Sequence, residues 1–132
     1  MAQATPQAFL PDLAASLTSL GLRLADVGRR EKALAATQEA ADLYRGLAEA
    51  APQAFRPDLA RSLGAHGMVL RGLQRHAEAA DAFGEGVRAL TPFFLRLPQA
   101  FAGLMDALVT DYLNACQAAG REPDGELLAP LR

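Results

Sequence analysis

One four-residue sequence occurs three times in this chain at a constant spacing. Pro-Gln-Ala-Phe begins at residues 6, 52 and 98, so each copy starts 46 residues after the one before. A gap-free overlay of residues 6–51 on residues 52–97 leaves 16 of 46 positions identical. Such a period is typical of stacked repeats, in which one unit cannot bury its apolar face alone. We therefore expect a single domain over residues 1–132, with repeats at about 6–51 and 52–97 and a partial repeat at about 98–132.

Within each repeat the apolar residues follow the period of an α-helix. In the first repeat they are separated by four, three, four and three residues, which places them on one face of a helix. The three sets are Leu13, Leu17, Leu20, Leu24 and Val27; Leu59, Leu63, His66, Leu70 and Leu73; and Met105, Val109, Tyr112, Cys116 and Ala119. Each repeat is therefore predicted to open with a helix, called helix A, whose stripe belongs to the core.

Proline and glycine predict where these helices begin and end. Proline followed by aspartate suits a first turn, which predicts starts at Pro11-Asp12 and Pro57-Asp58. Gly28 and Gly120 can adopt the left-handed conformation that closes a helix, and Gln74 stands at the equivalent place in the second repeat. The recurring Pro-Gln-Ala-Phe then falls between hairpins, where its proline is expected to end the preceding helix.

A second helix, helix B, completes each unit. In the first repeat it is expected from about Glu31 to Ala50. Small residues at Ala33 and Ala79, opposite Gly21 and Gly67 on helix A, let two antiparallel backbones approach closely. Each complete unit is therefore predicted to be a helix hairpin.

Two places depart from this scheme. Thr91-Pro92 interrupts helix B of the second repeat, so the helix either kinks there or stops and gives way to a short new turn. In the third repeat Gly125 and Pro130 leave room for at most two turns after helix A. The predicted fold class is an all-α solenoid of antiparallel helix hairpins with five principal helices: two full repeats plus a C-terminal capping helix.

At these positions the chain resembles the tetratricopeptide repeat family. The residues that carry the resemblance are Leu17, Leu20-Gly21, Leu24, Ala33, Thr37 and Ala40, with Leu63, His66-Gly67, Leu70, Ala79, Phe83 and Gly86 in the second repeat. The period of 46 exceeds the family's usual spacing of about 34 residues. In this respect the chain is similar to the extended variants of kinesin light chain and of repeat arrays attached to bacterial signalling proteins.

The resemblance implies that the chain is a protein-interaction module. Members of the family bind a peptide or partner helix in a groove lined by their A helices. The corresponding residues are Thr18, Leu22, Asp26, Arg61, Met68, Arg71, Thr110, Asn114 and Gln117. Leu22 and Met68 are apolar where hairpin packing does not require it, and two arginines add positive charge, which favours a partner with an apolar anchor and an acidic side chain. Alternatively, Leu22 and Met68 only cover neighbouring surface.

Catalysis is not expected. Cys116 and His66 could form a nucleophile and base, but the repeat overlay places both in the core stripe. His76 lies in a polar turn and has no second ligand at metal spacing. The sequence has no phosphate-binding loop, nucleophile elbow or zinc-protease motif. We therefore expect no cofactor, no metal and no small-molecule substrate.

Self-association is the alternative to a peptide-binding role. Phe93, Phe94 and Leu95 form an apolar cluster around a proline, either as the joint between the second and third units or as a self-association patch. The first helix A also has no unit before it, because residues 1–5 are too few to cover it. The chain could accordingly be a homodimer, a structural scaffold, or a fragment of a longer repeat array in a bacterial signalling or regulatory protein.

Composition limits the setting. The net charge of −2, and acidic residues on the same helices as the arginines, argue against binding to nucleic acid or to an anionic membrane. No apolar run approaches the roughly 20 residues that cross a bilayer, and no secretory leader is recognisable. Twelve arginines against a single lysine suggest a GC-rich, bacterial coding sequence. We expect a cytoplasmic protein.

Overall fold

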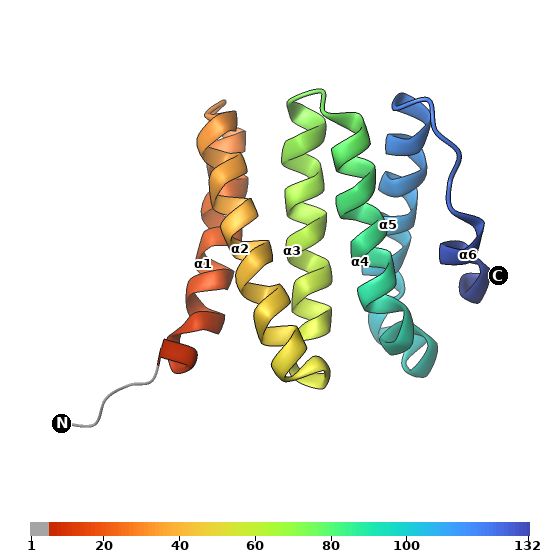
Figure 1. Cartoon of the computed structure of the whole chain (residues 1–132), viewed down its shortest axis with the longest axis horizontal. Helices are drawn as coiled ribbons and strands as arrows, with labels where there is room; N and C mark the ends of the chain where they lie inside the picture. The colour runs from red at the N-terminus through yellow and green to blue at the C-terminus, as the bar shows by residue number, and fades with distance from the viewer. Residues whose placement is uncertain (1–5) are drawn as a thin grey trace.

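The computed structural model describes residues 6–132 and consists of helices packed in chain order. Five helices have 21 residues each. They are α1 (Pro6–Asp26), α2 (Arg30–Ala50), α3 (Pro52–Gly72), α4 (His76–Arg96) and α5 (Pro98–Ala118), followed by the short α6 (Gly125–Leu128) and a 3-10 turn, η1 (Ala129–Leu131). Each of the five long helices packs on the next along the chain, and the short α6 lies against α4 (Figure 1). The prediction of an all-α helical repeat is confirmed at this level.

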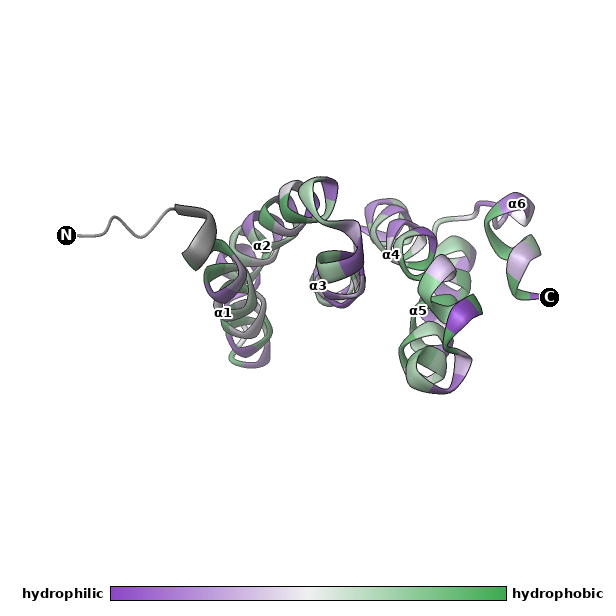
Figure 2. Cartoon of the chain, turned by 90° about the horizontal axis from the view of Figure 1, so that it is seen from below, coloured by the Kyte–Doolittle hydropathy of each residue, from purple (hydrophilic) through white to green (hydrophobic). Residues whose placement is uncertain are grey.

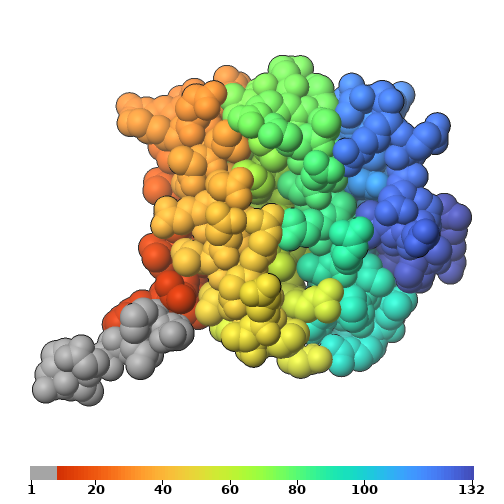
Figure 3. All heavy atoms as spheres, viewed as in Figure 1, coloured from red at the N-terminus to blue at the C-terminus, as the bar shows by residue number. Residues whose placement is uncertain are grey.

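The A and B helices take opposite sides of the array. Seen along the helices, α1, α3 and α5 lie on one side and α2 and α4 on the other (Figure 2). The space-filling view shows the helices as a slab in which neighbours in sequence are neighbours in space (Figure 3). The chain therefore presents two broad faces, one built by A helices and one by B helices.

The Pro-Gln-Ala-Phe repeats lie inside helices and do not connect them. Pro6, Pro52 and Pro98 are each the first residue of an A helix, where a missing backbone N–H removes no helical hydrogen bond. The single residues Ala51 and Leu97 separate successive hairpins. The predicted starts at Pro11-Asp12 and Pro57-Asp58 were therefore wrong, because these prolines lie inside α1 and α3.

The A helices end as predicted, with the same motif three times. Gly28, Gln74 and Gly120 have φ angles of +82°, +62° and +68°. The backbone N–H of the following arginine reaches back to the last turn of the helix each time: Arg29 to Leu24 at 2.8 Å, Arg75 to Leu70 at 2.9 Å and Arg121 to Cys116 at 2.9 Å. This is the Schellman arrangement, which satisfies otherwise unpaired carbonyls and turns the chain toward the B side.

Glycine sets the spacing within the hairpins. A Cβ atom added at Gly67 would lie 2.5 Å from Cε1 of Phe83, whose side chain is fully buried. Gly21 faces the methyl group of Thr37 just as closely. The predicted close packing at these glycines is confirmed, but the side chains that lie against them are Thr37 and Phe83 and not the predicted Ala33 and Ala79. The pairs Gly21–Thr37 and Gly67–Phe83 mark the same contact in successive units.

The predicted core stripe of α1 is only partly buried. Leu13, Leu20 and Val27 are 43%, 47% and 69% exposed, whereas their equivalents in α3, Leu59 and His66, are 7% and 6% exposed. The difference arises because α3 packs on α2 of the hairpin before it, and no described hairpin precedes α1. For α1 the prediction that this whole stripe belongs to the core was wrong.

Helix α4 continues through Pro92, so the alternative in which it stops at Thr91 was wrong. Proline cannot donate to the carbonyl of Arg88, four residues earlier. That carbonyl instead accepts a hydrogen bond from Nη2 of Arg56 on α3 at 3.1 Å. The hydroxyl of Thr91 donates to the carbonyl of Val87 at 2.7 Å. A neighbouring side chain therefore replaces the hydrogen bond that the proline removes.

The C-terminal segment folds back beside α4 and leaves one helical turn where at most two were predicted. The backbone N–H of Asp124 donates to the hydroxyl of Tyr112 at 2.8 Å, and Oδ1 of Asp124 accepts from the N–H of Glu126 at 3.0 Å. These bonds hold the single turn of α6, from which Leu127 is buried. The third helix B is thus reduced to one turn. Leu113 occupies the position on α5 that is glycine in α1 and α3, because no long helix B packs against it.

Candidate functional site

The predicted groove residues lie on the A-helix side of the array, and most are open to solvent. The exposed members are Asp26, Arg61, Met68, Thr110, Asn114 and Gln117, and the half-buried members are Thr18, Leu22 and Arg71. Met68 stands out because a large apolar side chain is 46% exposed in the last third of α3. Its equivalents in the neighbouring units are Leu22 on α1 and Asn114 on α5.

The sequence around Met68 keeps its side chain free within the helix. Residues four positions away on a helix contact one another, and here these positions are Gly64 and Gly72. Neither glycine has a side chain to pack against the thioether. Methionine is flexible and polarizable, and it adapts to irregular apolar partners. The last third of α3 therefore presents an apolar side chain with a glycine one turn before it and another one turn after it.

Two of the groove residues belong to contacts between helices. The hydroxyl of Thr18 donates to the carbonyl of Ala14 at 2.9 Å and lies 3.3 Å from the hydroxyl of Ser62, across the boundary of α1 and α3. Nη1 of Arg71 lies 3.0 Å from Oδ1 of Asp111 on α5, and its guanidinium carbon is 5.8 Å from the ring centre of Phe83. These side chains link neighbouring helices and are not free for a partner.

The positive charge of the groove is partly neutralised. Arg71 pairs with Asp111, and Arg61 lies 3.3 Å from Asp58 one turn away on α3. Pairs at this exposure contribute little to stability. The apolar character of Met68 is therefore the main feature that distinguishes this face, and attraction for an acidic partner is the weaker one.

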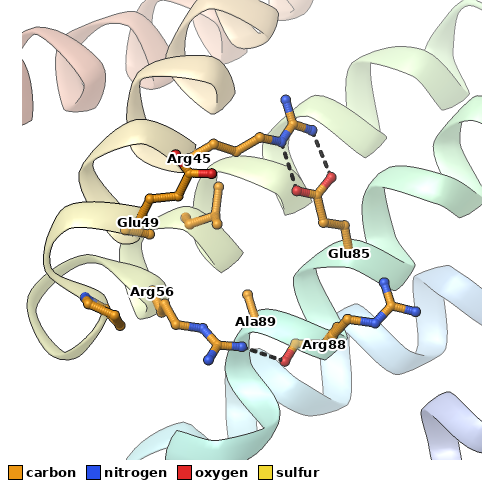
Figure 4. A pocket seen from close by; sticks show the side chains of 9 residues that line it. Arg45, Glu49, Arg56, Glu85, Arg88 and Ala89 are labelled. Atoms are coloured by element: carbon orange, nitrogen blue, oxygen red, sulfur yellow. Dashed lines mark hydrogen bonds and ion pairs between the residues drawn. The ribbon is translucent and has the colours of Figure 1, made fainter.

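The opposite face has a cavity that the sequence did not predict. About 400 Å³ lies between α2, the start of α3 and α4. Across it Arg45 binds Glu85 through two hydrogen bonds of 2.7 Å, while Arg56 reaches the backbone of Arg88 (Figure 4). Arg45 also contacts Asp42 at 2.7 Å, and the bond to Glu85 raises the pKa of its guanidinium. The pair Arg45–Glu85 spans 40 residues rather than the 46-residue period, so repeat comparison gave no signal for it.

The histidine and the cysteine considered for catalysis are both buried, as predicted. Cys116 is fully buried among apolar residues. His66 is 6% exposed, and its Nδ1 lies 2.9 Å from the hydroxyl of Thr37 on α2. Burial, and secondly the charge of Arg45, lowers the pKa of His66. His66 thus serves as a polar contact between hairpins, at the edge of a polar cavity of about 210 Å³.

The phenylalanines of the predicted self-association patch lie at the joint between units. Phe93 is 7% exposed, and its ring meets that of Phe101 on α5 edge to face, with 6.2 Å between centroids. Phe94 is half-buried against the core, and Leu95 is 54% exposed. Most of the apolar surface in this cluster is therefore used to dock α5 on α4.

Comparisons with models of protein families, with curated proteins and with solved structures found no match. Over residues 6–132, no helix is both long and apolar enough to cross a membrane, and no three histidine, cysteine or acidic side chains are grouped so that they could hold a metal ion.

Proposed function

We propose that this chain is a tetratricopeptide-like solenoid that binds a peptide or helix of another protein on its A-helix face. One observation carries the proposal: Met68 is a large apolar side chain, 46% exposed, in the last third of α3, the middle one of the three A helices. An amphipathic partner segment would place an apolar side chain against Met68 and polar ones toward the exposed residues of α5.

The proposal includes a non-catalytic role without a cofactor. A catalytic nucleophile and its base must reach one another and the substrate. Cys116 is enclosed in the core, and the Nδ1 atom of His66 faces Thr37 on another helix. The absence of an accessible pair among these side chains favours binding over chemistry.

The experiment uses peptides selected for binding. A library of random peptides displayed on phage is selected against the immobilised chain, and the binding site of the best peptide is mapped by amide chemical shifts. The largest shifts are expected around Met68 and its neighbours on α1 and α5. Met68→Glu should weaken binding by at least about tenfold, because a charge replaces the apolar anchor. The melting temperature should stay unchanged, because the side chain lies outside the core.

Leu95→Glu is the matched control. Leu95 is also an exposed apolar residue, but it lies near the end of α4. This variant should bind the peptide as the parent does. Arg71 is left unchanged in these variants because it contacts Asp111 and Phe83. A substitution of Arg71 would disturb this packing, and its effect on peptide binding could then not be separated from its effect on the fold. Shifts confined to the cavity between α2 and α4, or unchanged affinity of Met68→Glu, would refute the proposal.

A further inference from the structure

An uncovered apolar row runs along the outer side of α1. Its members are Phe9, Leu13, Leu20 and Val27, which are 59%, 43%, 47% and 69% exposed. Spacings of four and seven residues place them in line on one helix face, and at about 1.5 Å per residue Leu13 and Val27 are about 21 Å apart. Leu17 and Leu24 lie half-buried beside the row. We call Phe9, Leu13, Leu20 and Val27 the outer row.

The outer row has the residues of a face that packs elsewhere in the same molecule. Its equivalents on α3 are Phe55, Leu59, His66 and Leu73, and this side of α3 packs on α2 of the preceding hairpin. The contact includes the 2.9 Å interaction between His66 and Thr37. Leucine replaces the histidine in the outer row, so α1 presents a more apolar version of an inter-hairpin face.

A second copy cannot cover the outer row with a helix B. The packing faces of α2 and α4 are already buried between A helices, as the full burial of Ala40, Ala41 and Val87 shows. The third helix B is reduced to the single turn of α6. Leu113 moreover stands on α5 where close packing of a long helix needs glycine. A second copy does leave its own outer row open, and that row matches in length and apolar character.

We propose that two copies of this chain associate through their outer rows, with the α1 helices antiparallel about a two-fold axis near Leu20. This contact uses the same patch on both copies and therefore closes after two. It places Leu13 of one copy against Val27 of the other and Leu20 against Leu20. The charges agree with this direction, because Asp12 near the start of α1 comes close to Arg29 just beyond its end in the second copy.

The dimer leaves the proposed peptide-binding face open. Residues two positions apart in a helix are separated by about 200° around its axis. Leu22 therefore points away from the side of α1 that carries Leu20. Association and peptide binding are thus separate properties of α1, and either can be tested without the other.

The test is the mass of the 132-residue chain in solution, measured by sedimentation over a range of concentrations. The parent is expected at about 28 kDa, twice the 14.0 kDa of one chain. Leu20→Glu should give a monomer with an unchanged helical spectrum, because it places two carboxylates together at the axis. The control Leu95→Glu changes an equally exposed leucine at the end of α4 and should remain a dimer.

A symmetric cross-link tests whether the two copies meet at Leu20. With Leu20→Cys, mild oxidation should join two chains, since the same residue lies on both sides of the axis, whereas Leu95→Cys should stay a monomer in denaturing gels. Cys116 is fully buried and does not compete. The proposal is overturned if the parent is monomeric at high micromolar concentration, if Leu20→Glu remains dimeric, or if Leu95→Cys cross-links as readily as Leu20→Cys.

Discussion

Gly67 gives the most direct test of how the hairpins are built. Alanine in a helix is normally more stable than glycine by about 0.5–1 kcal/mol. At Gly67, however, the new Cβ atom would lie 2.5 Å from Cε1 and 2.7 Å from Cζ of Phe83. Phe83 is fully buried and cannot swing into solvent. Overpacking of this kind costs about 1–3 kcal/mol, so Gly67→Ala should lower the free energy of unfolding by about 1–2 kcal/mol in spite of the gain in helix propensity.

The matched control is Gly46→Ala on α2. A Cβ atom at Gly46 meets nothing within 4 Å, so only the helix propensity changes there. This variant should raise the free energy of unfolding by about 0.5–1 kcal/mol. Urea unfolding followed by circular dichroism at 222 nm measures both, and the two glycines should respond with opposite sign.

A double variant tests whether Phe83 is the cause. Phe83→Leu removes the ring atoms that the new Cβ would meet, so the cost of Gly67→Ala should fall when both changes are present. The interaction between the two sites should be at least about 0.5 kcal/mol. Equal stabilisation by Gly67→Ala and Gly46→Ala, or additive effects of Gly67→Ala and Phe83→Leu, would refute the close contact.

Two further predictions concern the turn after α3 and the buried histidine. Gln74 has a φ of +62°, so Gln74→Gly should raise the free energy of unfolding by about 1 kcal/mol. Gly28 has a φ of +82°, so Gly28→Ala should lower the free energy of unfolding by a similar amount. Urea unfolding measures both variants. Burial lowers the pKa of His66, so the unfolded chain binds this proton more readily than the folded one. Stability should therefore be complete above about pH 6.5 and fall below it. The His66→Leu variant should lose this dependence of stability on pH, and the control His76→Gln should keep it. Urea unfolding at pH values above and below about 6.5 measures both.

Periodicity predicted which segments are helical, because a 46-residue repeat and apolar spacings of three and four residues report on packing within each unit. It placed the start of α3 wrongly because two prolines compete there. Pro52 and Pro57 are five residues apart, and either suits a first turn. The helix begins at the earlier one, and the later one is accommodated inside it. Local sequence rules cannot choose between two such residues when tertiary packing extends the helix.

The effect of Pro92 on α4 was overestimated because the sequence around the proline does not show what replaces its missing hydrogen bond. The missing hydrogen bond is replaced by Arg56, which belongs to the helix before and lies 32 residues away along the chain. Likewise, the groove arginine Arg71 looked free in the sequence, although Asp111 neutralises it from 40 residues away. Interactions between side chains of different repeats depend on helix geometry, and the repeat period does not encode them.

The residues that differ between repeats carry more functional information than those that recur. Leu113 replaces a glycine of the repeat, and in the third unit no long helix B packs against that position. Leu20 replaces the histidine at its equivalent position, which makes the outer side of α1 more apolar than the matching side of α3. Leucine makes no hydrogen bond with water, so exposure to solvent alone does not favour Leu20 over the histidine at the equivalent position. The two ends of the described array therefore differ: α6 lies against α4 at one end, and at the other α1 leaves exposed the row of apolar side chains on which the proposed dimer depends.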